Sequence, residues 1–213
     1  MSNIRRESRE EIMIKYLAYL KPQKVIKGFR YIGRLIDSAY YKQKFQAGDN
    51  FYVYSFRNAK GMKNIKIGRN FNAGKQLRLE AWENYQDKTY NPEIIIGNNV
   101  MLGDDNHIGA INRITIGDYL LTGSNVYITD HNHGKSNESD CMIPPVQREL
   151  VSRGEVRIGN NVWLGNNVVV MDGVKIGNGV VIGANSVVTR DIPDYCVAVG
   201  SPARVIRDNR KMI

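Results

Sequence analysis

The sequence of 213 residues predicts an all-β solenoid, in the form of a parallel β-helix, with a helical extension at its N-terminus. Two observations predict this fold: a repeat with a period of six residues, and a basic amphipathic segment ahead of the repeats. Residues 158–193 divide into six consecutive hexads, which read IGNNVW, LGNNVV, VMDGVK, IGNGVV, IGANSV and VTRDIP. A period of six fits neither a helix nor a simple alternating strand, and it is typical of solenoids in which each short strand ends at a turn.

Each hexad contains core positions and corner positions. The fifth place is small or apolar, and Asn or Gly at the third and fourth places tolerates the left-handed backbone of a tight corner. Further copies of the repeat begin at Ile96 and Ile116, and a degenerate copy begins at Ile67. We expect the aliphatic side chains of the first place to stack inside the coil, and in the hexads of residues 158–193 these are Ile158, Leu164, Val170, Ile176, Ile182 and Val188.

The repeat divides the chain into an extension, residues 1–60, and a β-helix, residues 61–213. Residues 74–92 and 132–157 do not repeat, so we expect two loops there. Within the extension, apolar residues recur at positions 25 and 26, 29, 32, 35 and 36, and 39 and 40, which predicts one face of an amphipathic helix. Two interpretations stay open: a cap on the first coil, or a basic helix that lies on an anionic membrane surface.

The positive charge is concentrated in the extension. The whole chain carries +9, but residues 1–78 hold 18 Lys and Arg against 5 Asp and Glu, and the remainder is slightly acidic. The sequence contains none of the common nucleic-acid-binding motifs, so we expect no nucleic-acid partner. It also lacks a long apolar run and the apolar core of a signal peptide. We therefore expect a cytoplasmic protein with free thiols at Cys141 and Cys196, with peripheral contact at the inner membrane face as a further possibility.

The [LIV]-G-x-x-x-x repeat, together with residues 116–134, 158–191 and 197–207, resembles the hexapeptide-repeat acyltransferases. Within them the chain is most similar to the sugar and polysaccharide O-acetyltransferases related to maltose, galactoside and nodulation-factor acetyltransferases. This resemblance implies a left-handed coil, acetyl-CoA as co-substrate, a sugar or glycan acceptor, and a homotrimer whose active sites are shared between subunits. We expect no metal, because His131 and His133 are too close in the sequence to act as ligands from separate coils. A small acceptor (an amino sugar, serine or an antibiotic) and a non-enzymatic assembly module stay open as alternatives.

Histidine is the usual group that takes a proton from a hydroxyl near neutral pH, and this chain has three. His131 and His133 lie in TDHNHG, where the repeat breaks. The resemblance implies that His131 is the general base, and His133 would orient the loop or the acceptor. His107 ends a hexad whose repeat continues undisturbed, so we expect a structural role for it. The resemblance also places oxyanion support near Asn106, for which a simple corner residue is the alternative.

Two further groups of residues complete the predicted site. The non-repeating residues 74–92 include Glu80 and Trp82, whose side chains suit either sugar binding or packing against the coil. Arginine side chains are suited to the phosphates of CoA. The resemblance places the following residues on positions that contact CoA: Trp163, Asn166, Ala184, Thr189, Arg190, Arg204 and Arg207.

Overall fold

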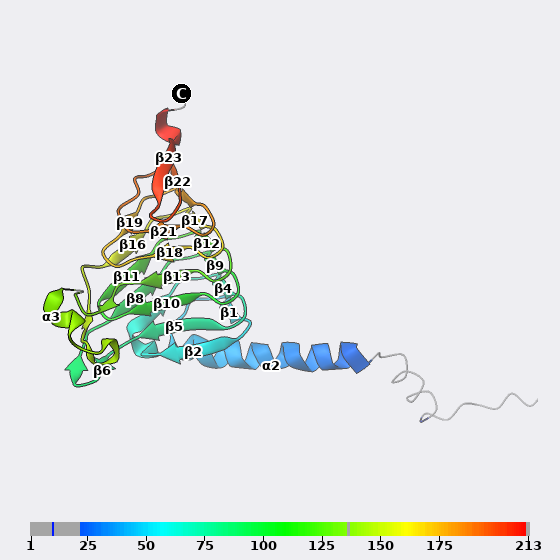
Figure 1. The fold of residues 1–213 in the computed structure, drawn as a ribbon. Helices are drawn as coiled ribbons and strands as arrows, with labels where there is room; N and C mark the ends of the chain where they lie inside the picture. The colour runs from blue at the N-terminus through cyan, green and yellow to red at the C-terminus, as the bar shows by residue number, and fades with distance from the viewer. Residues whose placement is uncertain (1–9, 11–21, 136, 212–213) are drawn as a thin grey trace, which may run out of the picture.

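A computed structural model describes residues 10, 22–135 and 137–211 of the chain, and most of them form a coil of short parallel strands (Figure 1). The coil has three sheets, of eight, six and five strands. Between β8 and β21 the chain passes from the five-stranded sheet to the eight-stranded and then the six-stranded sheet, and returns one turn later. Consecutive turns pair in parallel, so these sheets are the faces of a parallel β-helix.

The strands are short because each one ends at a corner of the coil. The eight-stranded sheet contains β1 (Tyr52–Val53), β4 (Asn72–Ala73), β9 (Met101–Leu102), β12 (Leu121–Thr122), β17 (Trp163–Leu164), β20 (Val181–Ile182), β22 (Cys196–Val199) and β23 (Arg204–Asp208). The six-stranded sheet contains β2 (Phe56–Lys60), β5 (Leu77–Ala81), β10 (His107–Ala110), β13 (Tyr127–Thr129), β18 (Val169–Val170) and β21 (Val187–Val188). The five-stranded sheet contains β3 (Ile65–Ile67), β8 (Glu93–Ile96), β11 (Arg113–Ile116), β16 (Val156–Ile158) and β19 (Lys175–Ile176).

The remaining elements lie outside these faces. Two hairpins leave the coil, β6 (Asn84–Tyr85) with β7 (Lys88–Thr89) and β14 (Asn132–His133) with β15 (Leu150–Val151). The described helices are α2 (Pro22–Lys44) and α3 (Glu138–Cys141), with short 3₁₀ turns at Met62–Asn64, Pro145–Gln147 and Asn209–Lys211. No helix in the described part of the chain is long and apolar enough to cross a membrane.

The hexad pattern explains both the core and the corners. All first-place and fifth-place side chains of residues 158–193 are buried, which confirms the predicted core positions. Five of the six fourth places take the left-handed backbone that the turn chemistry predicts. The residues with positive φ there are Asn161, Asn167, Gly173, Gly179 and Asn185.

Most second-place glycines are required by the close stacking of the turns. A Cβ atom on Gly123 would lie 2.7 Å from the backbone nitrogen of Asn166 on the next turn. Third-place side chains join the same stack, because Oδ1 of Asn160 accepts a hydrogen bond from the Asp118 nitrogen at 2.7 Å. The Gly-Asn and Gly-Asp pairs of the repeat therefore connect each turn to the next.

The boundaries of the coil differ from those that we expected. Parallel pairing begins with β1 and β2, ahead of residue 61, because Tyr52 already pairs with Asn72 one turn later. The first excursion is shorter than residues 74–92, because β5 belongs to the six-stranded sheet with Leu77, Leu79 and Ala81 buried inside it. The second excursion ends where β16 rejoins the five-stranded sheet.

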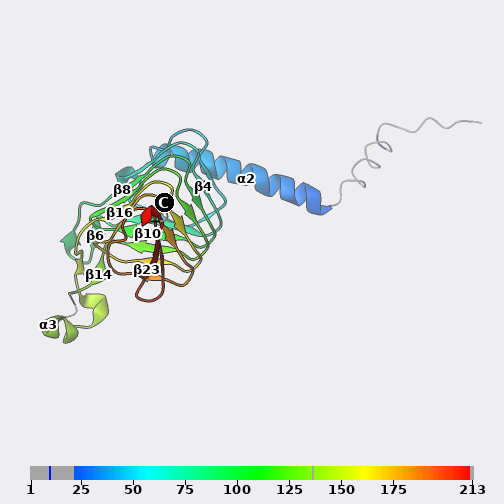
Figure 2. The ribbon, with the colours of Figure 1, turned by 90° about the horizontal axis from the view of Figure 1, so that it is seen from above.

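Helix α2 extends away from the base of the coil like an arm (Figures 1 and 2). Only its C-terminal end packs on the coil, where Ser38 is buried and its Oγ accepts a hydrogen bond from the Val53 nitrogen at 3.2 Å. The ring of Tyr41 lies 4.3 Å from that of Phe56, and Phe45, just after the helix, is fully buried. These aromatic side chains close the first turn, whereas the rest of the helix does not lie across it. Residues 1–9 and 11–21 of the extension lie outside the described residues.

The described apolar face of α2 is exposed along most of the helix. Phe29 is 72% exposed and Ile36 is 65% exposed, which is unusual for side chains of this size. The other exposed apolar side chains of the helix are Ile26, Tyr31, Ile32, Leu35 and Tyr40.

Candidate active site

A cavity of about 230 Å³ lies on the outer face of the six-stranded sheet, beneath the two excursions. Its floor comes from β5, β10 and β13, and its rim comes from the hairpins that leave the coil. The residues that line it are Arg78, Glu80, Trp82, Tyr85, His107, Tyr127, His131, His133 and Leu150. All three histidines of the chain therefore line one cavity, although His107 and His133 are 26 positions apart in the sequence.

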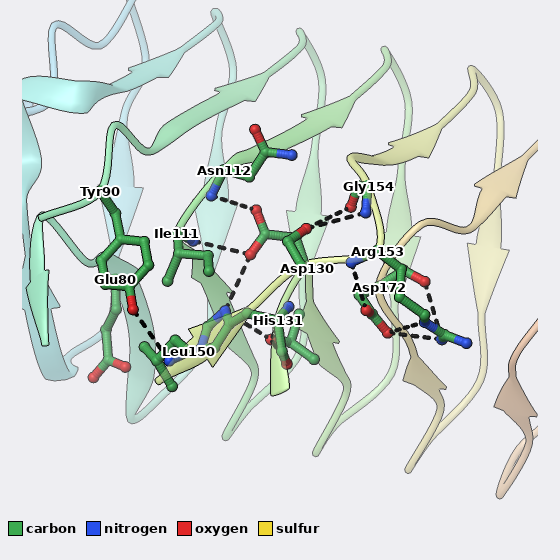
Figure 3. Close-up of polar contacts among 12 residues, drawn as sticks. Glu80, Tyr90, Ile111, Asn112, Asp130, His131, Leu150, Arg153, Gly154 and Asp172 are labelled. Atoms are coloured by element: carbon green, nitrogen blue, oxygen red, sulfur yellow. Dashed lines mark hydrogen bonds and ion pairs between the residues drawn. The ribbon is translucent and has the colours of Figure 1, made fainter. Parts of the chain in front are cut away.

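His131 is oriented by the residue that precedes it. Asp130 is fully buried at the end of β13, and its Oδ1 lies 3.0 Å from Nδ1 of His131 (Figure 3). The carboxylate also accepts hydrogen bonds from the backbone nitrogens of Ile111 and Asn112, each at 2.9 Å. Because a carboxylate can only accept, Nδ1 of His131 is the donor, and Nε2 of the neutral ring keeps a free lone pair. This is the tautomer that a general base needs.

A second carboxylate–imidazole pair lies in the same cavity. Glu80 is buried, and its Oε2 lies 3.0 Å from Nε2 of His107. Asn58 donates to Glu80 at 2.6 Å, and the Arg78 guanidinium donates at 3.1 Å. Burial alone would raise the pKa of Glu80, but the hydrogen bonds from His107 and Asn58 and the charges of His107 and Arg78 outweigh it and lower this pKa to about 2. Glu80 therefore forms part of the cavity wall with both oxygens already hydrogen-bonded.

His107 does not have the purely structural position that we expected from its undisturbed hexad. It takes the sixth place, which faces out of the coil, and the sheet register brings it beside Arg78 and Tyr127 on the neighbouring turns. Sequence reasoning missed these three cavity residues. The hexad register contains the signal, because places that face outward on adjacent turns must form a column.

The two excursions meet above the cavity. The Tyr85 hydroxyl donates to the Val146 carbonyl at 3.0 Å and lies 3.3 Å from Nδ1 of His133. The Tyr90 hydroxyl accepts from the Leu150 nitrogen at 3.1 Å (Figure 3). His133 is exposed at the rim, where it contacts the first excursion rather than His131. The two loops that we predicted separately therefore contact each other and together cover the cavity; we call this cover the roof of the site.

Trp82 is held at the rim by a cation. The Lys60 ammonium lies 3.5 Å from the centre of the Trp82 ring, and the Tyr85 ring packs edge-on against the indole at 6.3 Å. A cation over the ring face attracts the indole, so both contacts favour this position of the ring. Trp82 thus lines the cavity and also packs against its neighbours, so both predicted roles remain compatible with its position.

Asn106, the residue predicted to support the oxyanion, lies inside the coil and not in the cavity. The side chain is buried, and its Nδ2 donates to Thr122 Oγ1 at 2.7 Å and to the Gly123 carbonyl at 3.1 Å. Its Oδ1 accepts from the Val126 nitrogen at 2.7 Å. Asn106 occupies the fifth place of its hexad, which is a core position, and it is absent from the cavity lining. The corner of this hexad is Asp105, so Asn106 does not take the corner position that we considered as the alternative.

The residues expected to contact CoA lie on other parts of the coil. Trp163 is 52% exposed on β17 of the eight-stranded sheet, and Arg204 and Arg207 belong to β23 of the same sheet. His131, by contrast, follows a strand of the six-stranded sheet. The remaining members of this group lie at corners of the coil, and they are Asn166, Ala184, Thr189 and Arg190. None of these seven described residues lines the His131 cavity.

A larger cavity, of about 490 Å³, lies where the second excursion rejoins the coil. Arg153 and Asp172 form its base, with Nη2 of Arg153 at 2.7 Å from Oδ1 of Asp172 (Figure 3). Burial would raise the pKa of Asp172, but the hydrogen bonds and charge of Arg153 and a hydrogen bond from Asn132 outweigh it, so this pKa is lowered. This contact between the exposed Arg153 side chain and the buried Asp172 carboxylate attaches the end of the excursion to the neighbouring turn.

Neither metal ligands nor a reactive thiol mark the site. Over the described residues, no group of three or more His, Cys, Asp and Glu side chains could hold a metal ion. Cys141 is exposed on α3 and Cys196 is buried on β22, and both are free thiols. Neither cysteine lines the cavity that contains His131.

Comparison with known proteins adds independent findings. A family model described as "Bacterial transferase hexapeptide (six repeats)" matches residues 155–190. The chain is 46% identical over 147 residues to the "Putative lipopolysaccharide biosynthesis O-acetyl transferase WbbJ" of Escherichia coli K12, covering 67% of this chain and 71% of that protein. A solved maltose O-acetyltransferase from Clostridium difficile 630 is 32% identical with a TM-score of 0.50, covering 72% of this chain and 70% of that one.

A further solved structure shares the fold. It is the hexapeptide-repeat acetyltransferase VCA0836 of Vibrio cholerae O1 biovar eltor, complexed with acetyl coenzyme A. It is 23% identical with a TM-score of 0.50, covering 80% of this chain and 74% of that one. At this identity the likeness extends to the fold alone.

Proposed function

Since the chain belongs to the hexapeptide-repeat acyltransferases of the sugar O-acetyltransferase type, we propose that it acetylates a sugar hydroxyl of a surface polysaccharide or its precursor. It is an acyltransferase, and acetyl-CoA is its co-substrate. The proposal includes the left-handed coil that the resemblance implies. The observation that carries it is the Asp130–His131 pair in a cavity at a break of the repeat.

His131 acts as the general base in this proposal. Its Nε2 takes the proton from the acceptor hydroxyl as that oxygen attacks the acetyl carbonyl, and a tetrahedral oxyanion forms. When the carbon–sulfur bond breaks, the imidazolium returns the proton to the leaving thiolate. Asp130 holds Nδ1 throughout and stabilises the charged ring. The reaction needs no covalent enzyme intermediate, so neither free cysteine is required.

The acetyl donor is bound partly by a neighbouring subunit in this proposal. Arg190, Arg204 and Arg207 are exposed and carry the charge that the phosphates of CoA require. Trp163 and His131 belong to different faces of one chain, so a second chain is needed to bring the two halves together. A homotrimer supplies three such clefts by symmetry.

An exposed apolar column supports this assembly. Met101, Leu121 and Trp163 are paired on consecutive strands of the eight-stranded sheet and are 54%, 44% and 52% exposed. A contiguous apolar surface of this kind is typical of a protein interface. We propose that the neighbouring subunit covers this column in the trimer.

The acceptor is a glycan in this proposal, and the rim of the cavity suits it. Trp82 offers an aromatic surface for a sugar ring, and His133 orients the roof through Tyr85. We also propose a cytoplasmic enzyme with peripheral contact at the inner membrane face, where a lipid-linked glycan is presented. The exposed apolar face of α2 and the basic charge of the extension support this contact.

The test follows thiol release from acetyl-CoA over a panel of sugars, nucleotide sugars, amino sugars and serine. We expect transfer to sugar hydroxyls and a loss of about a hundredfold or more in kcat for His131→Ala, because a general base is removed. Met142→Ala is the matched control, because this side chain is 83% exposed at the tip of the second excursion. Wild-type rates for His131→Ala would contradict the catalytic proposal, and transfer only to serine or amines would contradict the acceptor class.

A further inference from the structure

The cavity contains one imidazole more than the proposed reaction needs. Asp130 holds His131, and Glu80 holds His107 in an equivalent carboxylate–imidazole contact, also at 3.0 Å. The general-base reaction proposed above uses only the Asp130–His131 pair. A buried carboxylate with three hydrogen-bonded partners is costly to assemble in a protein interior, so the second pair calls for an explanation.

Gly109 lies between the two imidazoles. A Cβ atom built on this residue would lie 3.2 Å from Nε2 of His107 and 3.7 Å from Cε1 of His131. The backbone does not require glycine here, because φ is not in the left-handed region and the nearest atoms all belong to the two histidine rings. Gly123 differs, since there a Cβ would meet the backbone of the next turn. The missing side chain at Gly109 therefore opens space only between the imidazoles.

We infer that the acceptor presents two neighbouring hydroxyls in this cavity, the reacting one to Nε2 of His131 and the adjacent one to Nδ1 of His107. His107 is then an acceptor-binding residue that helps to select which hydroxyl reacts, and Glu80 is its positioning residue. The acceptor class is a sugar with a vicinal pair of hydroxyls. This inference rests on the proposed function.

The hydrogen-bonding pattern of Glu80 supports these roles. The side chain of Glu80 is only 1% exposed, and both of its oxygens already accept hydrogen bonds from Arg78, Asn58 and His107, so it is poorly placed to bind a sugar directly. The carboxylate accepts the Nε2 proton of His107, which leaves Nδ1 as an acceptor in the neutral ring and as a donor in the charged ring. A hydroxyl can pair with either form. The substrate-binding role that we expected for Glu80 is therefore indirect.

The decisive test combines a variant with a change in the acceptor. Methyl glycosides of glucose, galactose and rhamnose are screened, and monodeoxy analogues of the best one are then compared. In the wild type, removal of the hydroxyl next to the acetylated one should raise the acceptor KM about tenfold, the loss of roughly one hydrogen bond. In His107→Ala the same removal should change KM less than twofold, because its partner is already gone. A purely structural role of His107 would not produce this dependence.

Two more variants test the same inference in case His107→Ala does not fold. Gly109→Ala keeps both histidines but places a methyl carbon 3.2 Å from Nε2 of His107, so this imidazole must shift. The acceptor KM should therefore rise about tenfold, and the acetyl-CoA KM should change less than twofold. Gly33→Ala adds the same methyl group on α2, where nothing lies within 4 Å, and should change neither value. An equal deoxy effect in wild type and His107→Ala, or an unchanged acceptor KM for Gly109→Ala, would overturn this inference alone. A wild type that acetylates no glycoside would overturn the proposed function and this inference with it.

Discussion

Asp130 holds the imidazole of His131 through a 3.0 Å contact between Oδ1 and Nδ1, although the two residues are neighbours in the chain. The same carboxylate accepts hydrogen bonds from the backbone nitrogens of Ile111 and Asn112 on the preceding turn. One buried side chain therefore orients the proposed base and also joins two turns of the coil. Catalysis and stability should depend on it together.

Asp130→Asn tests this double role. The amide of Asn replaces one acceptor oxygen with a donor, which must face either a backbone N–H or Nδ1 of His131. We expect kcat to fall about tenfold to a hundredfold, and the free energy of unfolding to fall by about 1–3 kcal/mol, because buried donors lose their acceptor. Steady-state kinetics and urea unfolding measure the two effects.

Asp118→Asn is the matched control. Oδ1 of Asp118 accepts a hydrogen bond from the backbone nitrogen of Asn98 on the preceding turn. Further along the coil, Oδ1 of Asn178 accepts the equivalent hydrogen bond from the backbone nitrogen of Asn160. Because the coil already uses Asn in this role, the control should keep both kcat and stability. An unchanged kcat for Asp130→Asn would mean that Asp130 does not orient His131.

The repeat predicts the coil well because its period has a direct geometric meaning. The first and fifth places point inside and the fourth place turns the corner, so each hexad could be placed without the structure. The same rule assigns Asn106 to the core and His107 to the surface. We missed both because we used the hexads to find where the repeat breaks and not to decide which way each side chain points. The information on these two residues was present in the sequence.

The roof of the site could not be predicted in the same way. The period indicates where the repeat breaks, but it contains no information on the direction in which an inserted loop folds. The hydrogen bond from the Tyr85 hydroxyl to the Val146 carbonyl joins residues that are 61 positions apart, and no pattern in the sequence predicts it. Similarly, the helical pattern predicted α2 but not its exposure, because an amphipathic pattern identifies an apolar face and not its partner.

The pKa of Glu80 predicts how stability depends on pH. Burial raises this pKa, but the hydrogen bonds and charges of its partners outweigh burial and lower it to about 2, against 4.5 for an ordinary Glu. Because the folded-state pKa lies below the unfolded one, ionised Glu80 stabilises the fold fully above about pH 4.5, and this stabilisation is lost as the pH falls toward about 2. The pH-dependent part amounts to roughly 3 kcal/mol.

Glu80→Gln isolates this contribution. At neutral pH the variant should unfold at a lower urea concentration than the wild type. The difference should narrow as the pH falls below about 4.5, because the wild type then loses the charge that the variant lacks. Urea midpoints measured between about pH 7 and about pH 3 provide the comparison. Parallel curves over this whole range would show that the Glu80 cluster does not hold an ionised carboxylate.

Shared active sites predict complementation between two inactive variants. His131→Ala lacks the base, and a double variant with Arg190→Glu and Arg204→Glu lacks cations for CoA. If each site takes its base from one subunit and its cations from the next, mixed trimers contain some sites with both halves intact. Co-expression in equal amounts should restore about a quarter of the wild-type activity, the random fraction of intact interfaces in a cyclic assembly. Activity that stays at the level of the separate variants would place each site within one chain.

The exposed face of α2 predicts salt-sensitive membrane binding. Phe29 and Ile36 are strongly exposed on a helix whose sequence also carries many basic residues. Such a helix lies in the interface of an anionic bilayer, held by apolar burial and by attraction to the lipid charge. We expect the protein to sediment with vesicles that contain phosphatidylglycerol at low salt and to be released at high salt, because salt screens the attraction.

The variants for this experiment separate the helix from the rest of the surface. A double change of Phe29→Glu and Ile36→Glu should abolish sedimentation, because it places charge on the apolar face. Met142→Glu introduces the same charge on an exposed side chain of the second excursion, so it should bind as the wild type does. If the helix variant loses its oligomeric state in light scattering instead of its vesicle binding, a second copy of the chain covers this face. Equal sedimentation of all three proteins would exclude α2 as the membrane contact.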